Sequence, residues 1–215
     1  MGDPARRLPP PENTVPQMIS DLDAYFRRQT RPQRAELTQV AIAAAADGIP
    51  AIGPQLGHLL TLLAQFGGVR RALDLGAGNG YSALYLADGM AAGGEIVALE
   101  QTPARAIAAR QNLAGAPVKT SVLIGAAQEV LMGLAPAFDL ILLDIDKADY
   151  LFTLDHCARL LRPGGLLVAD NTGFADAEPF NAALLADARF RSVNLLCLLP
   201  GHSPEQDGVA LAVRQ

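Results

Sequence analysis

From Arg70 onward, the chain alternates short apolar runs with segments long enough to form helices. The apolar runs are Ala72–Leu75, Ile96–Leu99, Val118–Ile124, Leu140–Leu143 and Leu166–Ala169. The helix-length segments between them are Tyr81–Met90, Pro103–Ala114, Ala126–Leu134 and Tyr150–Leu161. Strands separated by helices form βαβ crossovers, which give a mostly parallel sheet buried on both faces. The pattern therefore predicts an α/β fold with a doubly wound sheet.

The two ends of the chain add helices before this sheet and a hairpin after it. Residues 1–16 are rich in proline and polar groups and predict a flexible arm. Three helices are expected next, and the last of them ends at the glycine pair 67–68. The runs Val193–Leu199 and Val209–Val213 flank the polar turn GHSPEQDG, which predicts an antiparallel hairpin at the sheet edge. No linker interrupts residues 17–215, so we expect one domain with a helical cap over about residues 17–68.

Composition narrows the partners that such a domain could have. The chain has 215 residues, of which 50% are hydrophobic, and a net charge of −5 without a basic stripe. These values suit a single core and disfavour a nucleic-acid-binding surface. The two cysteines, Cys157 and Cys197, are far apart and fit a reducing compartment. No apolar run reaches the roughly 20 residues of a membrane span, and no secretory signal is recognised, so we expect a cytoplasmic protein.

A glycine-rich loop follows the first predicted strand, in the string DLGAGNGYS that covers residues 74–82. Glycines such as Gly76 and Gly78 let the backbone turn tightly and approach a ligand without a Cβ in the way. The next helix offers free N–H groups at its start, and Ser82 adds a hydroxyl donor. The glycines fall as G-x-G-x-G, whereas a dinucleotide fingerprint requires G-x-G-x-x-G. The preceding acid, Asp74, suits the ammonium and sulfonium of S-adenosylmethionine better than an anionic pyrophosphate.

Two polar residues stand at the ends of the next two strands. Glu100 follows Gly80 by twenty residues (100 − 80), and an acid at about this distance accepts hydrogen bonds from ribose hydroxyls. Gln128 follows the third strand and is placed to meet an adenine edge. These positions favour a nucleoside ligand over a simple solvated turn, but they fit NAD and S-adenosylmethionine equally well.

Acidic side chains end two further apolar runs abruptly, in the strings DIDKADY (residues 144–150) and ADN (residues 169–171). Adjacent strands lie about 4.8 Å apart, so Asp144 and Asp170 are expected to converge on one ion, with Asn171 as a third oxygen ligand. Oxygen ligands without thiolate or imidazole suit a hard cation. We therefore expect Mg²⁺, with Mn²⁺ or Ca²⁺ as alternatives. The competing interpretation is that each aspartate caps the following helix.

Taken together, these motifs resemble the metal-dependent O-methyltransferases typified by catechol and caffeoyl-CoA O-methyltransferase. The matching strings, between about residues 49 and 173, are LDLGAGNGYSALYLA, VALE, GAAQEVL, FDLILLDIDKADY and LLVADN. The pairing of DxDKxxY with a later DN is specific to that family, whereas the glycine loop alone indicates only the wider S-adenosylmethionine class. The resemblance implies a Rossmann-like, seven-stranded sheet whose last strand is antiparallel, and commonly a homodimer. The implied reaction is methyl transfer to a metal-coordinated hydroxyl of a small catechol-like or hydroxycinnamoyl-like molecule.

Carried over by position, the resemblance also assigns roles to residues. It implies that Asp144, Asp170 and Asn171 are the metal ligands and that Lys147 is the catalytic base, with Asp144 close to both sites. The implied cofactor-binding residues are Asp74, Gly76, Gly78, Ser82, Glu100, Gln128 and Asp144. A competing interpretation of Lys147 is that it only forms an ion pair with Asp146 or Asp149.

At one position the chain departs from the catechol enzyme. That enzyme supplies an acid from the loop before its last strand to hold a second substrate hydroxyl, whereas the matching position here is Gly201, with His202 and Glu205 nearby. Two other functions also fit the sequence: an NAD(P)-dependent oxidoreductase, and a catalytically idle protein that binds the cofactor and serves as a partner. Binding of NAD against S-adenosylhomocysteine distinguishes the first, and a methyl-transfer assay distinguishes the second.

Overall fold

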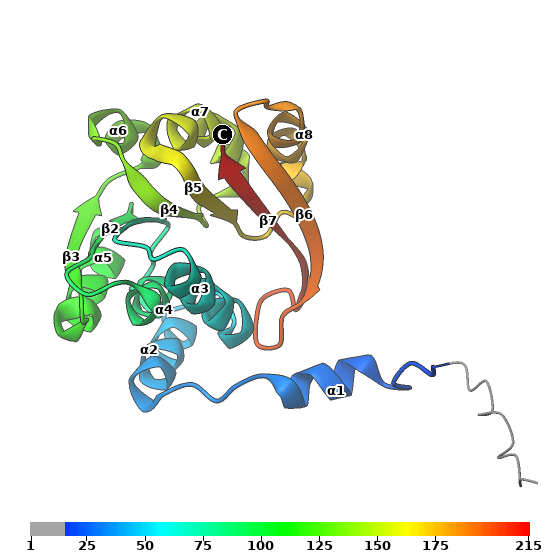
Figure 1. The fold of residues 1–215 in the computed structure, drawn as a ribbon. Helices are drawn as coiled ribbons and strands as arrows, with labels where there is room; N and C mark the ends of the chain where they lie inside the picture. The colour runs from blue at the N-terminus through cyan, green and yellow to red at the C-terminus, as the bar shows by residue number, and fades with distance from the viewer. Residues whose placement is uncertain (1–15) are drawn as a thin grey trace, which may run out of the picture.

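The structure, a computed structural model, describes residues 16–215 (Figure 1). The predicted arm lies outside the described residues except for its last residue. Within the described range, seven strands form one sheet. The strands are β1 (Arg71–Leu75), β2 (Glu95–Glu100), β3 (Lys119–Ile124), β4 (Phe138–Leu143), β5 (Leu161–Ala169), β6 (Phe190–Leu198) and β7 (Gln206–Arg214). Each apolar run of the sequence is therefore a strand, as predicted.

The order of the strands, β3-β2-β1-β4-β5-β7-β6, places a reversal beside β1. The chain leaves β1 toward β2 and β3 and then returns on the other side of β1 through β4, and β1 pairs in parallel with both neighbours. Strand β7 lies between β5 and β6 and is antiparallel to both, which confirms the predicted hairpin and the mostly parallel sheet. Ligands of doubly wound sheets bind beyond the carboxyl ends of the strands at such a reversal.

Helices cover both faces of this sheet (Figure 1). One face carries α2 (Ala35–Ala46), α3 (Pro54–Phe66), α4 (Tyr81–Gly89) and α5 (Pro103–Asn112), and the other carries α6 (Ala127–Val130), α7 (Tyr150–Leu160) and α8 (Glu178–Ala186). Helix α8 was not predicted, although Pro179 at its start and buried Phe180 and Leu184 are signals of a helix. Helix α6 is shorter than predicted, because the backbone after Val130 tightens into a 3₁₀ turn.

Successive residues of each central strand enter two separate hydrophobic cores. On β1, Ala72 faces the core beneath α2–α5, whereas Leu73 faces the core beneath α6–α8. The same alternation is seen at Leu140 and Ile141 of β4. Side chains alternate across a strand, so a strand buried on both faces is apolar at nearly every position. This burial explains why the central strands are continuous apolar runs in the sequence.

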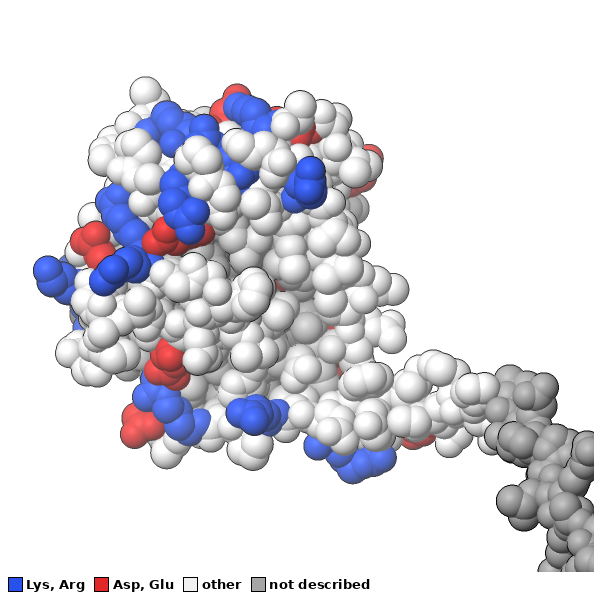
Figure 2. Space-filling model, viewed as in Figure 1, with Lys and Arg blue, Asp and Glu red and all other residues white. Residues whose placement is uncertain are grey.

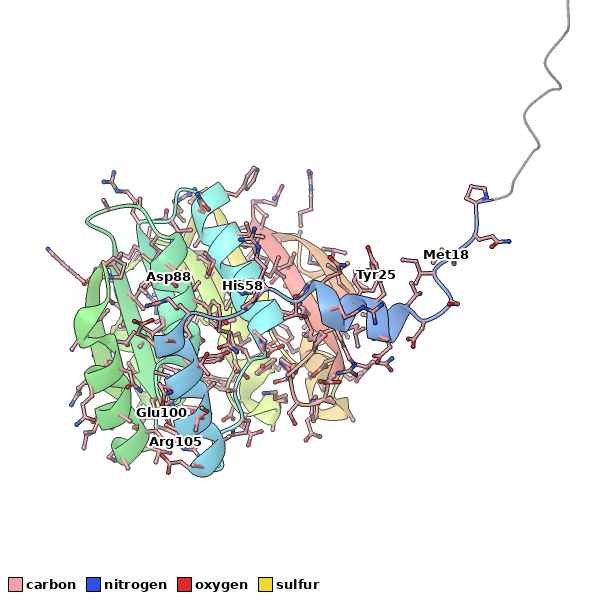
Figure 3. The ribbon with its side chains drawn as sticks, turned by 90° about the horizontal axis from the view of Figure 1, so that it is seen from below. Met18, Tyr25, His58, Asp88, Glu100 and Arg105 are labelled. Carbon is pink, nitrogen blue, oxygen red and sulfur yellow. The ribbon has the colours of Figure 1, made fainter. Side chains whose placement is uncertain are left out.

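Helix α1 (Leu22–Gln29) is set apart from this layered body. It has no buried residue, and it leads away from the sheet toward Met18 (Figures 1 and 3). Its contact with the body includes an ion pair of 2.5 Å between Arg27 Nη2 and Glu205 Oε2, in the loop between β6 and β7. The first predicted helix is therefore present, but its apolar residues do not join the core.

The surface seen in Figure 2 carries Lys and Arg in separate groups toward its rim, and the middle of that face carries none. Across residues 16–215, no helix is long and apolar enough to cross a membrane.

Candidate functional site

A cavity of about 620 Å³ opens beyond the carboxyl ends of β1, β2 and β4, where the strand order reverses. Most of the residues predicted to form the site line it, namely Gly76, Gly78, Glu100, Gln128, Asp144, Lys147 and Asn171. Ser82 lines a smaller adjoining pocket with Gly76 and Asp144. Two further predicted residues, Asp74 and Asp170, lie fully buried behind the wall at 0% and 1% exposure. The structure therefore brings the predicted residues of five separate segments to one place.

The glycine loop turns immediately after β1 and packs against the end of β4. The backbone N–H groups of Gly76 and Ala77 donate to the Leu99 carbonyl at 2.9 and 3.0 Å, which ties the loop to β2. Gly76 has a φ of +95°, and a Cβ at this position would lie 1.9 Å from the carbonyl oxygen of Asp144. Only glycine permits both the backbone conformation and this contact. The loop and the Asp144 strand end therefore form one continuous wall.

Asp74 lies beneath this loop as a buried acid with one free oxygen. Ser82 Oγ donates to Asp74 Oδ2 at 2.7 Å, whereas Oδ1 is buried without a hydrogen-bond partner among residues 16–215. Burial raises the pKa of Asp74 to about 7, and the hydrogen bond from Ser82 opposes that rise. A buried acceptor without a partner is costly unless a ligand satisfies it. Asp74 is thus suited to receive a cationic donor such as an ammonium group.

Glu100, at the end of β2, is hydrogen-bonded to the glycine loop. Its Oε2 accepts the backbone N–H of Gly78 at 2.9 Å, and its Oε1 accepts that of Thr102 at 2.8 Å. These bonds fix a carboxylate that lines the cavity and still has lone pairs for further donors. Arg105, on the first turns of α5, lines the same end of the cavity, and Figure 3 shows both side chains.

The end of β4 supplies Asp144 and Lys147 to the cavity. Lys147 Nζ lies 3.0 Å from Asp144 Oδ1 and donates to the Ile145 carbonyl at 3.0 Å. The lysine therefore pairs with Asp144 rather than with Asp146 or Asp149. Burial and the negative charge of Asp170 raise the pKa of Asp144 to about 6, although Lys147 lowers it. Capping of the following turn falls to Asp146, whose Oδ1 accepts the Ala148 N–H at 3.1 Å.

The end of β5 places Asp170 next to Asp144, and a histidine from a distant loop contacts it. His202 Nε2 lies 2.8 Å from Asp170 Oδ2, and His202 Nδ1 lies 2.9 Å from the Pro204 carbonyl. Burial lowers the pKa of His202, but the hydrogen bond and the charge of Asp170 outweigh burial and raise it above the ordinary value. Tyr150 links the ends of β4 and β5, since its hydroxyl lies 3.1 Å from the Leu143 carbonyl and 2.9 Å from the Asp170 carbonyl.

Oxygen groups at these strand ends match the donor chemistry of a hard divalent cation. The carboxylate of Asp170 is close enough to disfavour ionisation of Asp144, and a cation relieves such repulsion. Asn171 lines the same cavity and adds an amide oxygen. Within residues 16–215, no three His, Cys, Asp or Glu side chains gather as a metal-binding group. A cation held here would therefore depend on Asn171 as its third protein ligand.

Sequence reasoning missed several residues of the site. Neither the contact of His202 with Asp170 nor the contact of Asp207 with Asn171 at 2.7 Å was predicted. The wall also includes Phe174 and Asp176, in the segment after β5. The Asp-Gly pair at the start of the last strand, β7, was the signal available for Asp207. Glu205, near the position that departs from the catechol enzyme, pairs instead with Arg27 of α1.

Comparison with known proteins places this geometry among methyltransferases. The family model described as O-methyltransferase matches residues 29–194. Catechol O-methyltransferase of Niastella koreensis is 31% identical over 219 residues, which cover 92% of this chain and 98% of that protein. The O-methyltransferase of Bacillus cereus, solved in complex with S-adenosylhomocysteine, is 27% identical with a TM-score of 0.79, over 90% of this chain and 96% of that one. The O-methyltransferase TomG of Streptomyces achromogenes, solved with S-adenosylmethionine, is 25% identical with a TM-score of 0.78, over 91% of this chain and 96% of that one.

Proposed function

This chain belongs to the O-methyltransferase family, and we propose that it methylates a hydroxyl of a small catechol-like or hydroxycinnamoyl-like molecule held beside a divalent cation. Methyl transfer from S-adenosylmethionine follows from the family and from relatives solved with the cofactor or its product. The same findings decide against the two alternative functions, an NAD(P)-dependent oxidoreductase and a catalytically idle protein that binds the cofactor. The acceptor class, the cation and the roles of individual residues are the proposed part.

The contact between Gly76 and Asp144 carries this proposal. The cofactor loop touches the backbone of Asp144, while the side chain of Asp144 lies beside Lys147 and Asn171. A methyl donor on the loop and a hydroxyl at Asp144 would thus be neighbours. Direct displacement requires reacting atoms to be held in line at about 3–3.5 Å, and such positioning supplies much of the rate of a two-substrate reaction.

The cofactor half of the cavity is proposed to use one acid at each end. S-adenosylmethionine supplies an electrophilic methyl group on a sulfonium. Asp74 Oδ1 would accept the ammonium of its amino-acid part, because that oxygen has no partner in the structure. Glu100 would accept the ribose hydroxyls through its remaining lone pairs, and Gln128 would meet the adenine edge. Gly76, Gly78 and Ser82 would shape the loop around the cofactor.

The acceptor half is proposed to hold Mg²⁺, or else Mn²⁺ or Ca²⁺, on Asp144, Asp170 and Asn171. Such a cation acts as a Lewis acid that favours the ionised form of a hydroxyl. A phenol-like hydroxyl with a pKa near 10 is ionised in roughly one molecule in a thousand at pH 7, a deficit of about 4 kcal/mol. Lys147 lies in the same wall, and its Nζ is proposed to take the proton of the hydroxyl.

A methyl-transfer assay tests this function directly. The full chain is incubated with S-adenosylmethionine, Mg²⁺ and a panel of catechols and hydroxycinnamoyl compounds, and methylated product is measured by mass spectrometry. We expect product that disappears when a chelator is added and returns with excess Mg²⁺. Activity that persists at full rate in the chelator would contradict the cation, and product from neither compound class would contradict the acceptor.

Three broader expectations also remain proposals. We propose that residues 17–215 act as one domain, that the protein is cytoplasmic and that it is a homodimer. The dimer is supported by α1, which exposes Leu22 and Phe26 at 41% and 46% without burying any residue. An isolated helix of this length is marginal in water, so its apolar face needs a partner. Light scattering after size-exclusion chromatography gives the mass, and a monomer would contradict the proposal.

A further inference from the structure

Asn171 and Asp207 are hydrogen-bonded to each other although they lie 36 positions apart in the sequence. Asn171 Nδ2 donates to Asp207 Oδ2 at 2.7 Å, and both side chains are buried. The other carboxylate oxygen of Asp207, Oδ1, accepts the backbone N–H groups of Gly173 at 3.1 Å and Gly208 at 2.6 Å. Both oxygens of Asp207 are therefore engaged with donors.

The chemistry of this pair decides which way the amide of Asn171 faces. A carboxylate only accepts hydrogen bonds, so it selects the NH₂ group of the amide and turns the carbonyl oxygen away. Asn171 lines the cavity that also contains Asp144 and Lys147. The amide oxygen is the only atom of the Asn171 side chain that can ligate a hard cation, because an NH₂ group has no lone pair to offer.

The backbone around this pair is shaped so that the segment after β5 can approach the start of β7. Thr172 N donates to the Gly208 carbonyl at 2.9 Å, and Asn171 has a φ of +51°. A Cβ on Gly173 would lie 2.7 Å from Asp207 Oδ1, and one on Gly208 would lie 2.5 Å from Thr172 Oγ1. A side chain at either glycine would push these two segments apart and separate Asn171 from Asp207.

We propose that Asp207 is a positioning residue that orients the amide of Asn171 so that its oxygen, and not its nitrogen, faces the cation. Asp207 touches neither the cation nor the substrate in this arrangement and acts only through Asn171. The inference rests on the proposed function, since it presupposes a divalent cation at Asp144, Asp170 and Asn171. It assigns to the Asp-Gly pair at the start of β7 a role in cation binding.

The substitution Asp207→Asn tests the proposal because it keeps the shape of the side chain but inverts its polarity. The two backbone N–H groups still require an acceptor, so the new amide would keep its oxygen toward them and turn its NH₂ toward Asn171. The Asn171 amide would then have to rotate to accept that donor, which points its own NH₂ at the cation. We expect Mn²⁺ affinity to fall by about 10- to 100-fold, the range for outer partners of metal ligands.

The measurement is binding rather than turnover. Mn²⁺ is titrated into the full chain and free Mn²⁺ is followed by electron paramagnetic resonance, while S-adenosylhomocysteine affinity is measured separately by calorimetry. S-adenosylhomocysteine binding should change less than about threefold, because Asp207 touches none of the residues around the glycine loop. A merely structural loss would weaken both ligands together.

A paired variant separates orientation from packing. Asn171→Asp combined with Asp207→Asn gives position 171 a side chain with two oxygens, one to accept from the new amide and one to face the cation. We expect Mn²⁺ affinity to recover to at least that of the unaltered chain. Should Asp207→Asn alone fail to fold, as reported by lost S-adenosylhomocysteine binding, this paired variant decides the question by the same criterion.

Asp139 provides a matched control at the other end of the sheet. Its Oδ2 also accepts two backbone N–H groups, those of Arg70 and Arg71, and its Oδ1 accepts a side-chain donor from Arg162. Asp139→Asn should therefore cost comparable stability and leave Mn²⁺ affinity unchanged.

The outcomes divide clearly. If Asp207→Asn binds both ligands as the unaltered chain does, or if the paired variant binds S-adenosylhomocysteine but not Mn²⁺, Asp207 does not position Asn171 and the proposal is overturned. If the unaltered chain binds no Mn²⁺ at all, the cation of the proposed function is wrong, and the role of Asp207 falls with it.

Discussion

Ser82 Oγ donates a hydrogen bond of 2.7 Å to Asp74 Oδ2 and leaves Oδ1 of the same carboxylate buried without a partner. One oxygen of the carboxylate is therefore hydrogen-bonded within the protein, and the other is available to a ligand. Burial raises the pKa of Asp74 to about 7, so the carboxyl loses its proton only near neutral pH. Under the proposed role of Asp74 in binding the cofactor, this arrangement would couple cofactor binding to pH.

We expect the affinity for S-adenosylhomocysteine to fall as the pH decreases below 7. The ligand ammonium requires the ionised carboxylate, so a proton must leave Asp74 on binding, which weakens affinity by up to about tenfold per pH unit. Calorimetry between pH 5.5 and 7.5 measures the dependence. Ser82→Ala should shift its midpoint to higher pH, because the Ser82 hydrogen bond lowers the pKa of Asp74. A flat profile in the unaltered chain would contradict this assignment.

The same acid should make the unliganded protein less stable as the pH rises. The pKa of Asp74 is higher in the folded state than its ordinary value of 3.8, so the folded state binds more protons between pH 4 and 7. Its contribution to the free energy of unfolding is therefore largest at acidic pH and declines up to about pH 7. Urea unfolding of Asp74→Asn should show a weaker decline over this range than the unaltered chain. An identical decline in both would exclude Asp74 as the cause.

Gly76→Ala should disrupt the site far more than an alanine at another left-handed glycine. The new Cβ would lie 1.9 Å from the Asp144 carbonyl oxygen, so β4 and the loop must separate. Gly93→Ala is the control, because its φ is +76° but no atom lies within 4 Å of the added Cβ. We expect Gly93→Ala to cost about 1–2 kcal/mol in urea unfolding. Gly76→Ala should cost clearly more and abolish S-adenosylhomocysteine binding, and equal costs would contradict the direct contact.

Asp144→Ala should abolish cation binding and weaken cofactor binding to a much smaller extent. The substitution removes a carboxylate from the proposed ligand set but keeps the backbone carbonyl that packs against Gly76. Mn²⁺ titration should show a loss of more than about 100-fold, since only one carboxylate ligand remains. Methyl transfer should become undetectable. Unchanged activity of this variant in the presence of a chelator would remove the cation from the mechanism.

The parts of the fold that follow local patterns were predictable from the sequence. Strands such as β1 and β4 are buried on both faces, so they are mostly apolar, and the site residues are the polar side chains within or just after them, Asp74 inside β1 and Asp144 after β4. Edge strand β6 is different, because Leu196 is 87% exposed while Phe190 at its start is buried, and its amino end was missed. Burial on both faces leaves a continuous apolar signal that the amino end of β6 lacks.

The contacts of His202 and Asp207 could not be predicted in the same way. Each reaches the end of β5 from more than thirty residues away in the sequence, His202 at Asp170 and Asp207 at Asn171. These contacts exist because β7 inserts between β5 and β6, which is a property of strand order and not of residue spacing. The sequence pattern indicated the hairpin but did not indicate which of its loop residues would face the site.

Lys147→Met should remove the lower limb of the pH dependence of kcat, provided that Lys147 is the base. Lys147 Nζ is only 3.0 Å from Asp144 Oδ1, so the lysine could instead serve merely to neutralise that carboxylate. A base must be deprotonated to act, so its removal lowers the rate and flattens the rise toward alkaline pH. If Lys147 instead only neutralises Asp144, its removal would leave that rise in place. We expect a loss of about 10²–10⁴-fold in kcat at the optimum, the usual contribution of a general base.

Lys147→Arg is the matched control, since it keeps the positive charge beside Asp144 but cannot lose a proton, and it should resemble Lys147→Met. Retained activity in the arginine variant with an unchanged lower limb would show that charge, and not proton transfer, is what Lys147 supplies.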